Sequence, residues 1–567
     1  MTRQSEGKRI RNEARDRDYP NRFPLNRNNG EEEDAEHNRK NYRNYIANYS
    51  KSLPHYDINN NNAGEVKPDA YKKLLHAVDS EDPNDFEKIP VGNKNPLTNP
   101  LSGLSFDLEG LDSHATYVPP APRIDSPEAA GEVAELYWMV LCRDVHFNDF
   151  GTDIEIQHAV DDLSTNYSKF PLPKNSNTHP VTTKNIFRGF TKGDVTGPYL
   201  SQFLLLGSKD VDQDSKDGYI KYGCQRIDQR QLTVMGGKQN DYLTKYQDWL
   251  DVQDGTKNPA DPNNIACGNN YDTLRRFIRN MRDLANYVHY DDLPQEFINA
   301  CLILLHFDPP CKNPRADFDP QNPYMRRYKK QVGFGTFGPP HIFTLVTEVT
   351  TRALKAAWYH KWFVHRRLRP EAFGGLIHRQ KTTTRPPSVP NPSYPIHNEI
   401  LNSEVLNRIN ADYGSYLLPQ VFPEGSPTHP SYPAGHATIA GACVTILKAF
   451  FMEDYKISQS VNPVVASIDG TALVDYNGPD KDELTIRGEL DKLAANIAIG
   501  RNMAGVHYRS DYTQSLLLGE QIACSILEDQ EKTYREKYCI KFHKFDGSVY
   551  HTGSDCRRTE KERCVDI

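Results

Sequence analysis

The chain carries the stretch Arg501-Asn-Met-Ala-Gly-Val-His507, with Asp511 four residues further on. Residues i and i+4 of a helix share one face, so we expect His507 and Asp511 to meet. A carboxylate on one imidazole nitrogen fixes the tautomer and leaves the other nitrogen free as a ligand. Gly505 can break the helix and let Arg501 and His507 converge. Taken alone, the stretch also fits a helix–turn–helix with a surface arginine and a capping histidine.

A second segment, His429-Pro-Ser-Tyr-Pro-Ala434-Gly435-His436, leads into an apolar helical run. Glycine at the start of this helix lets the backbone approach a ligand closely. His436 then lies in the first turn, where an imidazole can act as acid or base toward a bound group. The alternative for this segment alone is a capped helix of the core.

A third segment, Lys361-Trp-Phe-Val-His-Arg-Arg-Leu-Arg369, precedes Pro370. We expect one helix that carries Lys361 and Arg369 near the same face, because eight residues make just over two turns. Pro370 would end this helix. Because residues 365–367 are also basic, the segment alone could be a solvated basic face.

From the three segments we select the permanent cations Lys361, Arg369 and Arg501, the histidines His436 and His507, a glycine turn and a carboxylate. Arginine offers a planar fork to paired oxygens, and lysine adds a compact positive charge. A helix N-terminus adds free backbone N–H groups that point at an anion. The joint occurrence therefore favours a single site for a dense, tetrahedral oxyanion.

The overall composition argues against nucleic acid and against a membrane-spanning segment. The 567 residues carry a formal net charge of −7, which argues against nucleic acid as the main partner. No apolar run reaches the roughly 18 residues of a membrane span, and no secretory signal is seen in this numbering. We therefore expect a soluble protein whose compartment stays open.

The ten cysteines form no C-x-x-C pair, so we expect no zinc site. Cys301, Cys443 and Cys524 lie in apolar helical stretches and are interpreted as small core residues. Cys556 and Cys564 lie in a polar tail and could pair with each other or with another chain, which their spacing does not decide.

The chain divides into a polar N-terminal arm (1–65), one large helical catalytic domain (66–547) and a polar C-terminal tail (548–567). The arm is either disordered or wraps a neighbouring subunit. Its tyrosines Tyr42, Tyr45 and Tyr49 have a helical spacing that could bury a stripe. The active site would come from 358–370, 429–436 and 501–511.

Apolar residues at three- and four-residue intervals predict a mainly α protein. Ser126 and Pro127 predict a helix start, with Ser126 as the N-cap. Further helices are predicted at 271–290, 294–306, 341–365, 398–411, 436–453, 486–503 and 507–530. A hairpin could join Tyr219–Tyr222 to Gln231–Val234. Proline-rich stretches at 308–324 and 384–395 are predicted loops.

The pattern K-x7-R-P, (S/A)-G-H and R-x5-H-x3-D resembles the active site of the vanadium-dependent haloperoxidases. Bacterial class A acid phosphatases and related lipid phosphatases share this site architecture. Over about 100–547 the chain is similar to the red-algal and cyanobacterial bromoperoxidase branch. Four further runs carry this similarity: Gly103–Gly110, Gly197–Phe203, Asp248–Asp254 and Asn496–His507.

The resemblance implies an all-α fold built from two four-helix bundles, with vanadate (vanadium(V)) bound between them. His507 would bind vanadium with Asp511 behind it, and His436 would be the acid–base residue. The groups that would neutralise or hydrogen-bond the vanadate oxygens are the side chains of Lys361, Arg369 and Arg501 and the N–H of Gly435. The activity implied is oxidation of bromide and iodide by hydrogen peroxide to hypohalous acid, which halogenates small organic acceptors.

Three positions modify this expectation. Ala434 stands where many members have a serine that hydrogen-bonds vanadate, which removes a contact of about 1 kcal/mol. A histidine at the position of His429 goes with bromoperoxidases in this family, and phenylalanine with chloroperoxidases. Trp358 is a residue that the chloroperoxidases also carry, so chloride oxidation stays open, as does the natural acceptor. The role of His360, which flanks the site, is open as well.

Two rival functions remain at this point. A phosphatase would use His507 as the nucleophile and His436 as the acid to the leaving group. A structural or storage protein would keep the pocket as a relic. Some red-algal relatives carry a calcium loop where this chain has the basic stretch Tyr324–Lys330, so we predict no calcium there. The family's bromoperoxidases are dimers to dodecamers, and the long arm predicts a homo-oligomer.

Overall fold

The computed structural model describes residues 3–18, 48–92, 95–105, 107–170, 181–209, 214–256, 271–307, 322–383 and 391–556. The described α-helices are α1 (Arg3–Asp18), α3 (Pro68–Ser80), α4 (Pro83–Phe86), α5 (Pro127–Cys142), α6 (Ile154–Thr165), α7 (Tyr246–Gln253), α8 (Met281–Tyr290), α9 (Gln295–Leu305), α10 (Pro323–Arg326), α11 (Pro339–Tyr359), α12 (Pro370–Thr382), α13 (Asn398–Leu401), α14 (Glu404–Tyr413), α15 (Gly435–Phe450), α16 (Ile486–Met503) and α17 (Arg509–Glu531). Within these described ranges, no helix is long and apolar enough to cross a membrane.

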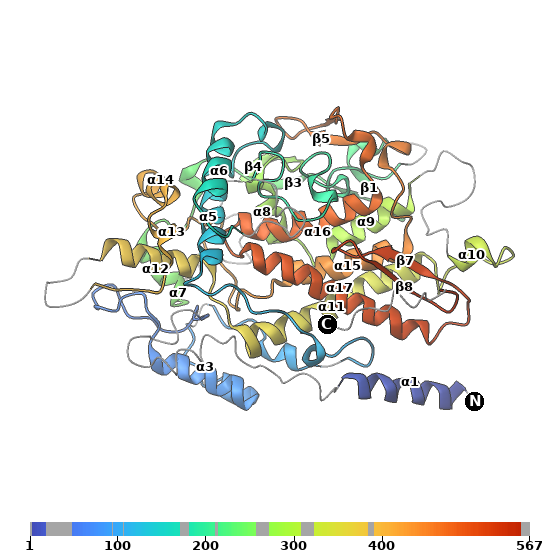
Figure 1. Ribbon diagram of the computed structural model, residues 1–567, viewed down its shortest axis with the longest axis horizontal. Coiled ribbons are helices and arrows are strands. Elements are labelled where there is room, and N and C mark those ends of the chain that lie inside the picture. Colours follow the sequence, from blue (N-terminus) through green and yellow to red (C-terminus); the bar gives the residue numbers. More distant parts are fainter. Residues whose placement is uncertain are drawn as a thin grey trace.

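The centre of the molecule is a bundle of α11, α15, α16 and α17 (Figure 1). Every residue of α15 except His436 is buried, and α15 contacts the other three helices. A helix that is apolar all round belongs in a core, so this one sets the middle of the bundle. The N-terminus of α15 therefore lies inside the protein, where side chains from the neighbouring loops can reach it.

Other helices cover this bundle. α8 packs on α16, while α9 packs on α11 and α15, and α5 carries α6, α13 and α14 on its outer side. Ser126 caps α5 by accepting a hydrogen bond from the Ala129 amide at 3.1 Å, which confirms the predicted helix start. The predicted mainly helical fold is thus confirmed, and the described strands form only short antiparallel pairs.

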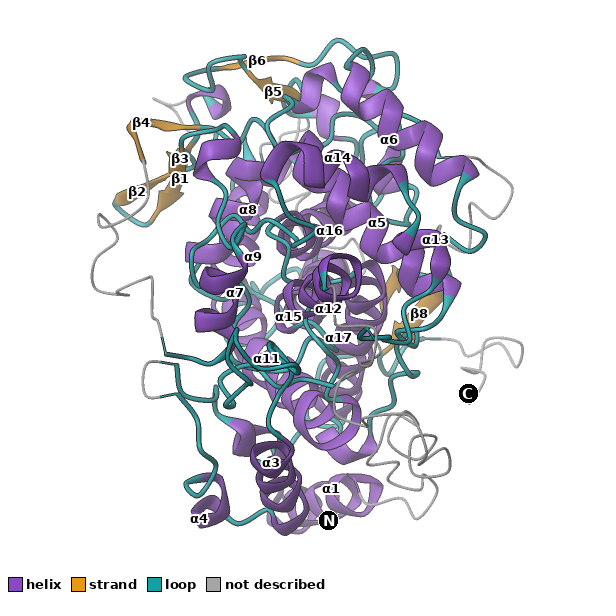
Figure 2. Cartoon of the chain, turned by 90° about the vertical axis from the view of Figure 1, so that its left-hand side faces the viewer, coloured by secondary structure: helices purple, strands orange, loops and turns teal. Residues whose placement is uncertain are grey.

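The strands are β1 (Tyr219–Tyr222), β2 (Gln225–Asp228), β3 (Gln231–Val234), β4 (Tyr271–Arg276), β5 (Val464–Ala466), β6 (Leu473–Asp475), β7 (Ile540–His543) and β8 (Val549–Thr552), paired in that order two by two. The predicted hairpin between β1 and β3 is wrong. Each strand has another partner: β1 folds back on β2 through a two-residue turn that contains Gly223, and β3 pairs with β4. Figure 2 shows β1–β4 together at one edge of the molecule.

Two predicted helices are interrupted by residues that cap a new helix. The stretch predicted at 271–290 is β4 followed by α8, because Asn280 accepts a hydrogen bond from the Asp283 amide and starts a new helix. The stretch predicted at 398–411 is α13 and α14, because Ser403 caps α14 through the Leu406 amide. Side-chain caps offer the backbone an alternative to a continuous helix.

The end of the N-terminal arm packs on the catalytic domain. Tyr49 is buried and meets the Trp362 ring edge-on, with 5.5 Å between ring centroids. Tyr42 and Tyr45 lie outside the described residues, so the predicted tyrosine stripe stays a prediction. Helix α3 adds its apolar face to the same cluster, and Figure 2 shows α3 and α4 at the end of the molecule near α1. Residues 48–65 thus belong to the folded body.

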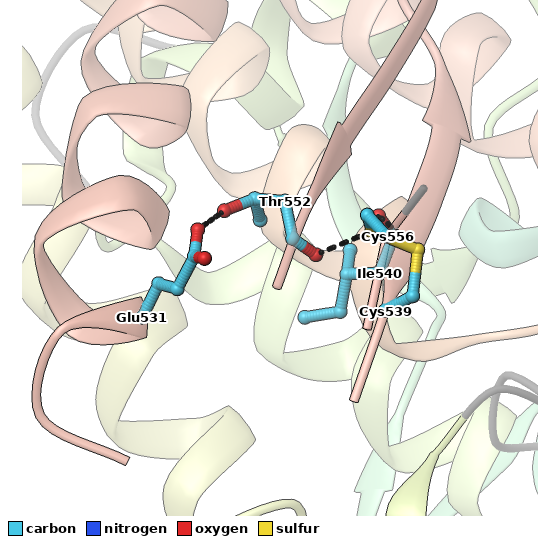
Figure 3. Close-up of a disulfide and its surroundings, with 5 residues drawn as sticks. All are labelled: Glu531, Cys539, Ile540, Thr552 and Cys556. Carbon is cyan, nitrogen blue, oxygen red and sulfur yellow. Dashed lines mark hydrogen bonds between the residues drawn. A yellow bond between two sulfur atoms is a disulfide. The ribbon is translucent and has the colours of Figure 1, made fainter. Parts of the chain in front are cut away.

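The C-terminal hairpin of β7 and β8 is closed by a disulfide between Cys539 and Cys556 (Figure 3). The hairpin crosses the boundary predicted at residue 547. Cys556 pairs with Cys539, which directly precedes β7, rather than with either of the two partners left open; Cys564 is outside the described residues. Cys301, Cys443 and Cys524 are buried, as predicted.

Candidate active site

One guanidinium ties the three segments together. Arg369 donates from Nε to the His429 carbonyl at 2.9 Å and from Nη1 to the Val506 carbonyl at 2.7 Å. Lys361 reaches the same place and donates from Nζ to the carbonyls of Pro430 at 2.7 Å and Ser431 at 2.8 Å. The predicted gathering of distant segments around one buried position is therefore present in the fold.

The backbone that presents Lys361 and Arg369 differs from the predicted single helix. α11 ends at Tyr359, a π-helical turn spans His360–His365, and Arg366 takes a left-handed conformation with φ of 44°. Arg369 is extended, and Pro370 is the first residue of α12 rather than a terminator. Proline fits the first helical position because its missing N–H is not needed there, and it favours an extended residue before it.

The basic residues between Lys361 and Arg369 are not a solvated face. His365, Arg366 and Arg367 are all buried. Arg367 donates to the Asp511 carboxylate at 2.6 Å and to the Glu132 carboxylate at 2.9 Å. Sequence reasoning missed the roles of Arg367 and Glu132, because the partners lie 235 positions apart and carry no local signal.

His507 lies in the loop between α16 and α17 rather than on a helix. Gly505 has φ of +86°, which turns the chain after α16 and aims His507 back at Arg369. His507 Nδ1 lies 2.8 Å from Asp511 in the first turn of α17, so the predicted pair forms across a helix start. Arg369 donates to His507 Nε2 at 3.1 Å, which leaves the proton on Nδ1 and the lone pair on Nε2.

The electrostatics keep His507 neutral. Burial, followed by the charge of Arg369, holds the pKa of His507 well below its usual range. Burial alone would raise the pKa of Asp511, but the charge of Arg367 and the hydrogen bonds from His507 and Ser431 hold it well below its usual value. Ser431 donates to Asp511 and is another residue that sequence reasoning missed. A neutral imidazole oriented by an ionised carboxylate is the usual form of a metal-binding histidine.

The start of α15 forms another wall of the site. Ala434 is the N-cap, and its N–H donates to Ser515 Oγ at 2.8 Å. A Cβ added at Gly435 would lie 3.1 Å from the Trp358 ring, so glycine keeps the helix N-terminus close to that wall. His436 Nε2 lies 3.1 Å from Asp291, a carboxylate at the end of α8 that sequence reasoning did not identify.

Three buried cations face this position without a matching number of anions. Burial, then the charge of Arg369, holds the pKa of Lys361 well below its usual range. Burial, then the charge of Arg501, lowers the pKa of Arg369 to about 10. Arg501 donates from Nη1 to the Val288 carbonyl at 2.8 Å, while its buried Nε has no hydrogen-bond partner among the described residues. Such a cluster would be relieved by a bound oxyanion.

His429 and Trp358 flank the cluster. Their ring centroids lie 4.6 Å apart, and Arg369 donates to His429 Nδ1 at 3.0 Å. Burial and the charge of Lys361 hold the pKa of His429 well below its usual range. His360 points elsewhere, because its Nε2 lies 2.9 Å from the Thr116 hydroxyl, and burial lowers its pKa to about 3.

Known proteins resemble the chain over most of its length. Residues 341–536 match a family model described as the VCPO second helical-bundle domain. A vanadium-dependent bromoperoxidase of Corallina officinalis is 39% identical, covering 89% of this chain and 90% of its own length. The bromoperoxidase of Corallina pilulifera is 40% identical with the same coverage, and that of Ascophyllum nodosum is 35% identical over 89% and 86%.

A solved structure agrees with the sequence relatives. The homohexameric second vanadate-dependent bromoperoxidase of Ascophyllum nodosum matches with a TM-score of 0.81 and 28% identity, covering 98% of this chain and 91% of that one. The resemblance stated from three motifs is therefore confirmed over nearly the whole chain, together with the helical fold. The chain belongs to the vanadium-dependent haloperoxidase family, and within it to the bromoperoxidases.

Proposed function

We propose that this protein is a vanadate-dependent haloperoxidase that oxidises bromide and iodide with hydrogen peroxide to hypohalous acid. The observation that carries the proposal is the buried cluster of Lys361, Arg369 and Arg501 around a neutral His507 whose Nε2 lone pair faces Arg369. Vanadate bound there would supply a Lewis acid that activates hydrogen peroxide toward halide. The hypohalous acid would then halogenate small organic acceptors.

The side chains fit vanadate by their own chemistry. His507 Nε2 would be the ligand to vanadium, and the three cations would neutralise the oxygens. The N–H of Gly435 at the start of α15 would add a hydrogen bond from a helix N-terminus. His436 is the one α15 residue that is not buried, which supports its proposed role as the acid–base group facing incoming peroxide.

The proposed preference for bromide depends on His429. This imidazole accepts a hydrogen bond from Arg369 and lies against Trp358, so it shapes both the charge and the wall of the pocket. The whole-length relatives are bromoperoxidases by name, which supports the same preference. No observation on the described residues favours a phosphatase.

A halide-by-halide assay of the reconstituted protein tests the proposal. Vanadate-free protein should be inactive, and added vanadate should restore bromination of monochlorodimedone with hydrogen peroxide and bromide or iodide. Hydrolysis of p-nitrophenyl phosphate without any bromide-dependent reaction would instead assign a phosphatase. A protein inactive in both assays with vanadate bound would indicate a pocket kept as a relic.

We also propose that the chain assembles as a homo-oligomer. The structural neighbour is a homohexamer, and residues 48–65 of the predicted arm (1–65) pack on the catalytic domain, which leaves the part of the arm before Asn48 as a candidate contact between subunits. Light scattering of the full chain and of a chain that begins at residue 48 would show whether the part of the arm before Asn48 is needed for assembly.

Replacing Ala434 with serine is expected to strengthen vanadate binding by about five-fold, since one hydrogen bond is worth about 1 kcal/mol. Ala434 is buried at the N-cap of α15 and directly precedes Gly435, whose N–H is proposed to bind the anion, so we expect an added hydroxyl to bind it as well. The dissociation constant of vanadate measured on the metal-free protein checks this. Ala437→Ser, an added hydroxyl one turn further along α15, is the control, and equal affinities for the two variants would contradict the expectation.

A further inference from the structure

A second buried carboxyl group lies behind the proposed acid–base histidine. His436 Nε2 contacts Asp291 Oδ1 at 3.1 Å, and Asp291 is followed after four residues by Glu296, in the first turn of α9. The side chains of Asp291 and Glu296 are within hydrogen-bonding reach of each other. Glu296 is fully buried, with an exposed fraction of 0%. The three groups therefore form a line from His436 into the protein.

Glu296 has to be uncharged. Apart from the neighbouring carboxyl group, no residue of the described chain donates a hydrogen bond to either oxygen of Glu296 or to Asp291 Oδ2. A buried carboxylate without donors is strongly unfavourable, whereas a carboxylic acid can donate its proton to a neighbouring carboxylate. Burial, then the negative charge of Asp291, raises the pKa of Glu296 well above its usual value.

Asp291 is the ionised member of the pair. Burial opposes its ionisation, but the charge and hydrogen bond of His436, the hydrogen bond from Glu296 and the charge of Arg501 together lower its pKa. The other titratable groups that face Glu296 are Tyr287 on α8 and Cys443 on α15, and both are neutral. One proton is therefore shared between two carboxyl groups, because two adjacent charges would repel.

Water can reach Asp291. A cavity of about 330 Å³ is lined by Asp291 together with Tyr287, Gln295 and Asn299, so its wall beside the pair is polar. Water in this cavity can hydrogen-bond to these polar groups and pass protons between them. The cavity lies on the side of Asp291 and α9 and supplies a route for protons that does not cross the cation cluster.

The proposed reaction consumes a proton in every turnover. Hydrogen peroxide, bromide and one proton give hypobromous acid and water: the O–O bond breaks, bromide loses two electrons, and peroxide is reduced. The group that gives up this proton has to be protonated again before the next turnover. A neutral acid that reaches the donor through Asp291, with the cavity beside Asp291, is suited to that step.

We propose that Glu296 is a positioning residue that stores a proton and returns it to His436 through Asp291. The proposal rests on the proposed haloperoxidase function, because it is that reaction which consumes a proton in each turnover. The sharing of a proton between Glu296 and Asp291 does not depend on it. At alkaline pH, where protons from solution are scarce, Glu296 can still supply one to His436, so the store extends the working pH range upward.

Glu296→Gln tests the proposal, because glutamine keeps the shape and can donate to Asp291 but has no proton to release. The alkaline limb of kcat is expected to move down by roughly one pH unit, which is about a ten-fold loss of rate at a fixed pH on that limb. On the acid side, kcat and the KM for bromide should stay within two-fold of the parent. The solvent deuterium dependence of kcat should change from curved to linear, since fewer protons move.

Glu520→Gln is the matched control. Glu520 is buried on α17, its pKa is raised by burial to about 7, and it accepts a hydrogen bond from the Phe545 amide at 2.8 Å, away from His436. Its pH profile should match the parent. A profile of Glu296→Gln that also matches the parent would overturn the proposal. If Glu296→Gln does not fold, Glu296→Met removes the buried polar group altogether and should give the same shift.

A titration of the metal-free protein separates this proposal from the proposed function. In infrared difference titrations, the parent should show the carbonyl band of a protonated carboxyl group that persists well above the usual pH range of a glutamate, and Glu296→Gln should lose that band. If that difference appears but the loaded protein oxidises no halide, the shared proton stands and the haloperoxidase function fails. Identical titrations in both proteins would refute the store itself.

Discussion

The His507→Ala variant is expected to lose stoichiometric vanadate binding. The His507 imidazole is neutral: Asp511 fixes its proton on Nδ1, and Nε2 keeps a lone pair that faces Arg369. The other two imidazoles belong to other walls of the site, His429 against Trp358 and His436 beside Asp291. We therefore expect neither of them to replace the lost ligand.

What remains in this variant is electrostatic attraction by Lys361, Arg369 and Arg501. We expect at least a hundred-fold weaker binding, which corresponds to about 3 kcal/mol. The residual binding should fall with salt far more steeply than that of the parent, because an ionic attraction without a bond to the metal is easily screened. Vanadium content after gel filtration, measured at low and high ionic strength, gives both quantities.

A matched control for the loss of an imidazole is His378→Ala on α12. His378 is partly buried and contacts Tyr246 and the Tyr416 amide rather than the cation cluster. It should retain vanadium in full. Tight, stoichiometric vanadium in His507→Ala would contradict the assignment of the ligand.

The candidate site could be predicted where each motif carried its own chemistry. His507 and Asp511 were expected to pair, and they do, although the pair forms across the start of α17 rather than along a helix. Lys361 and Arg369 were expected on one face of one helix, and both reach the site through a π turn and an extended segment. The residue types and their spacing indicated that Lys361 and Arg369 belong to the same site. The backbone conformation that brings them there depends on packing, which the sequence does not show.

Residues that act through distant partners could not be predicted in this way. A solvated basic face stayed open as an alternative for Arg367, because its carboxylate partners lie on α5 and α17, far away in the sequence. Asp291 follows a helix in an unremarkable polar turn, and only the fold brings it to His436. The same limit applies to β4, since the partner strand β3 lies across a long connection. A single sequence shows local periodicity, but not which remote charges neutralise each other.

The His436→Ala variant is expected to keep vanadate and lose turnover by a hundred-fold or more. General acid–base catalysis by a positioned group contributes about 10²–10⁴-fold, and no other imidazole at the start of α15 can take over. His436 is not among the cations or ligands proposed to hold the anion, so the vanadium content of the variant should match the parent. Steady-state kinetics on samples normalised to vanadium content checks this.

Asp291→Asn refines the reading of this result. Asparagine keeps a hydrogen bond to His436 but carries no charge, so it should reduce turnover less than His436→Ala while leaving vanadium bound. If His436→Ala turned over at the parental rate, another group would be the acid–base catalyst. Glu296 and Asp291 would then not pass protons to a reacting group. If it lost vanadium instead, His436 would belong with His507 among the groups that hold the anion. Because the two histidines occupy separate walls, with His507 bonded to Asp511 and His436 to Asp291, the variants should fail in different ways: one without cofactor, the other without proton transfer.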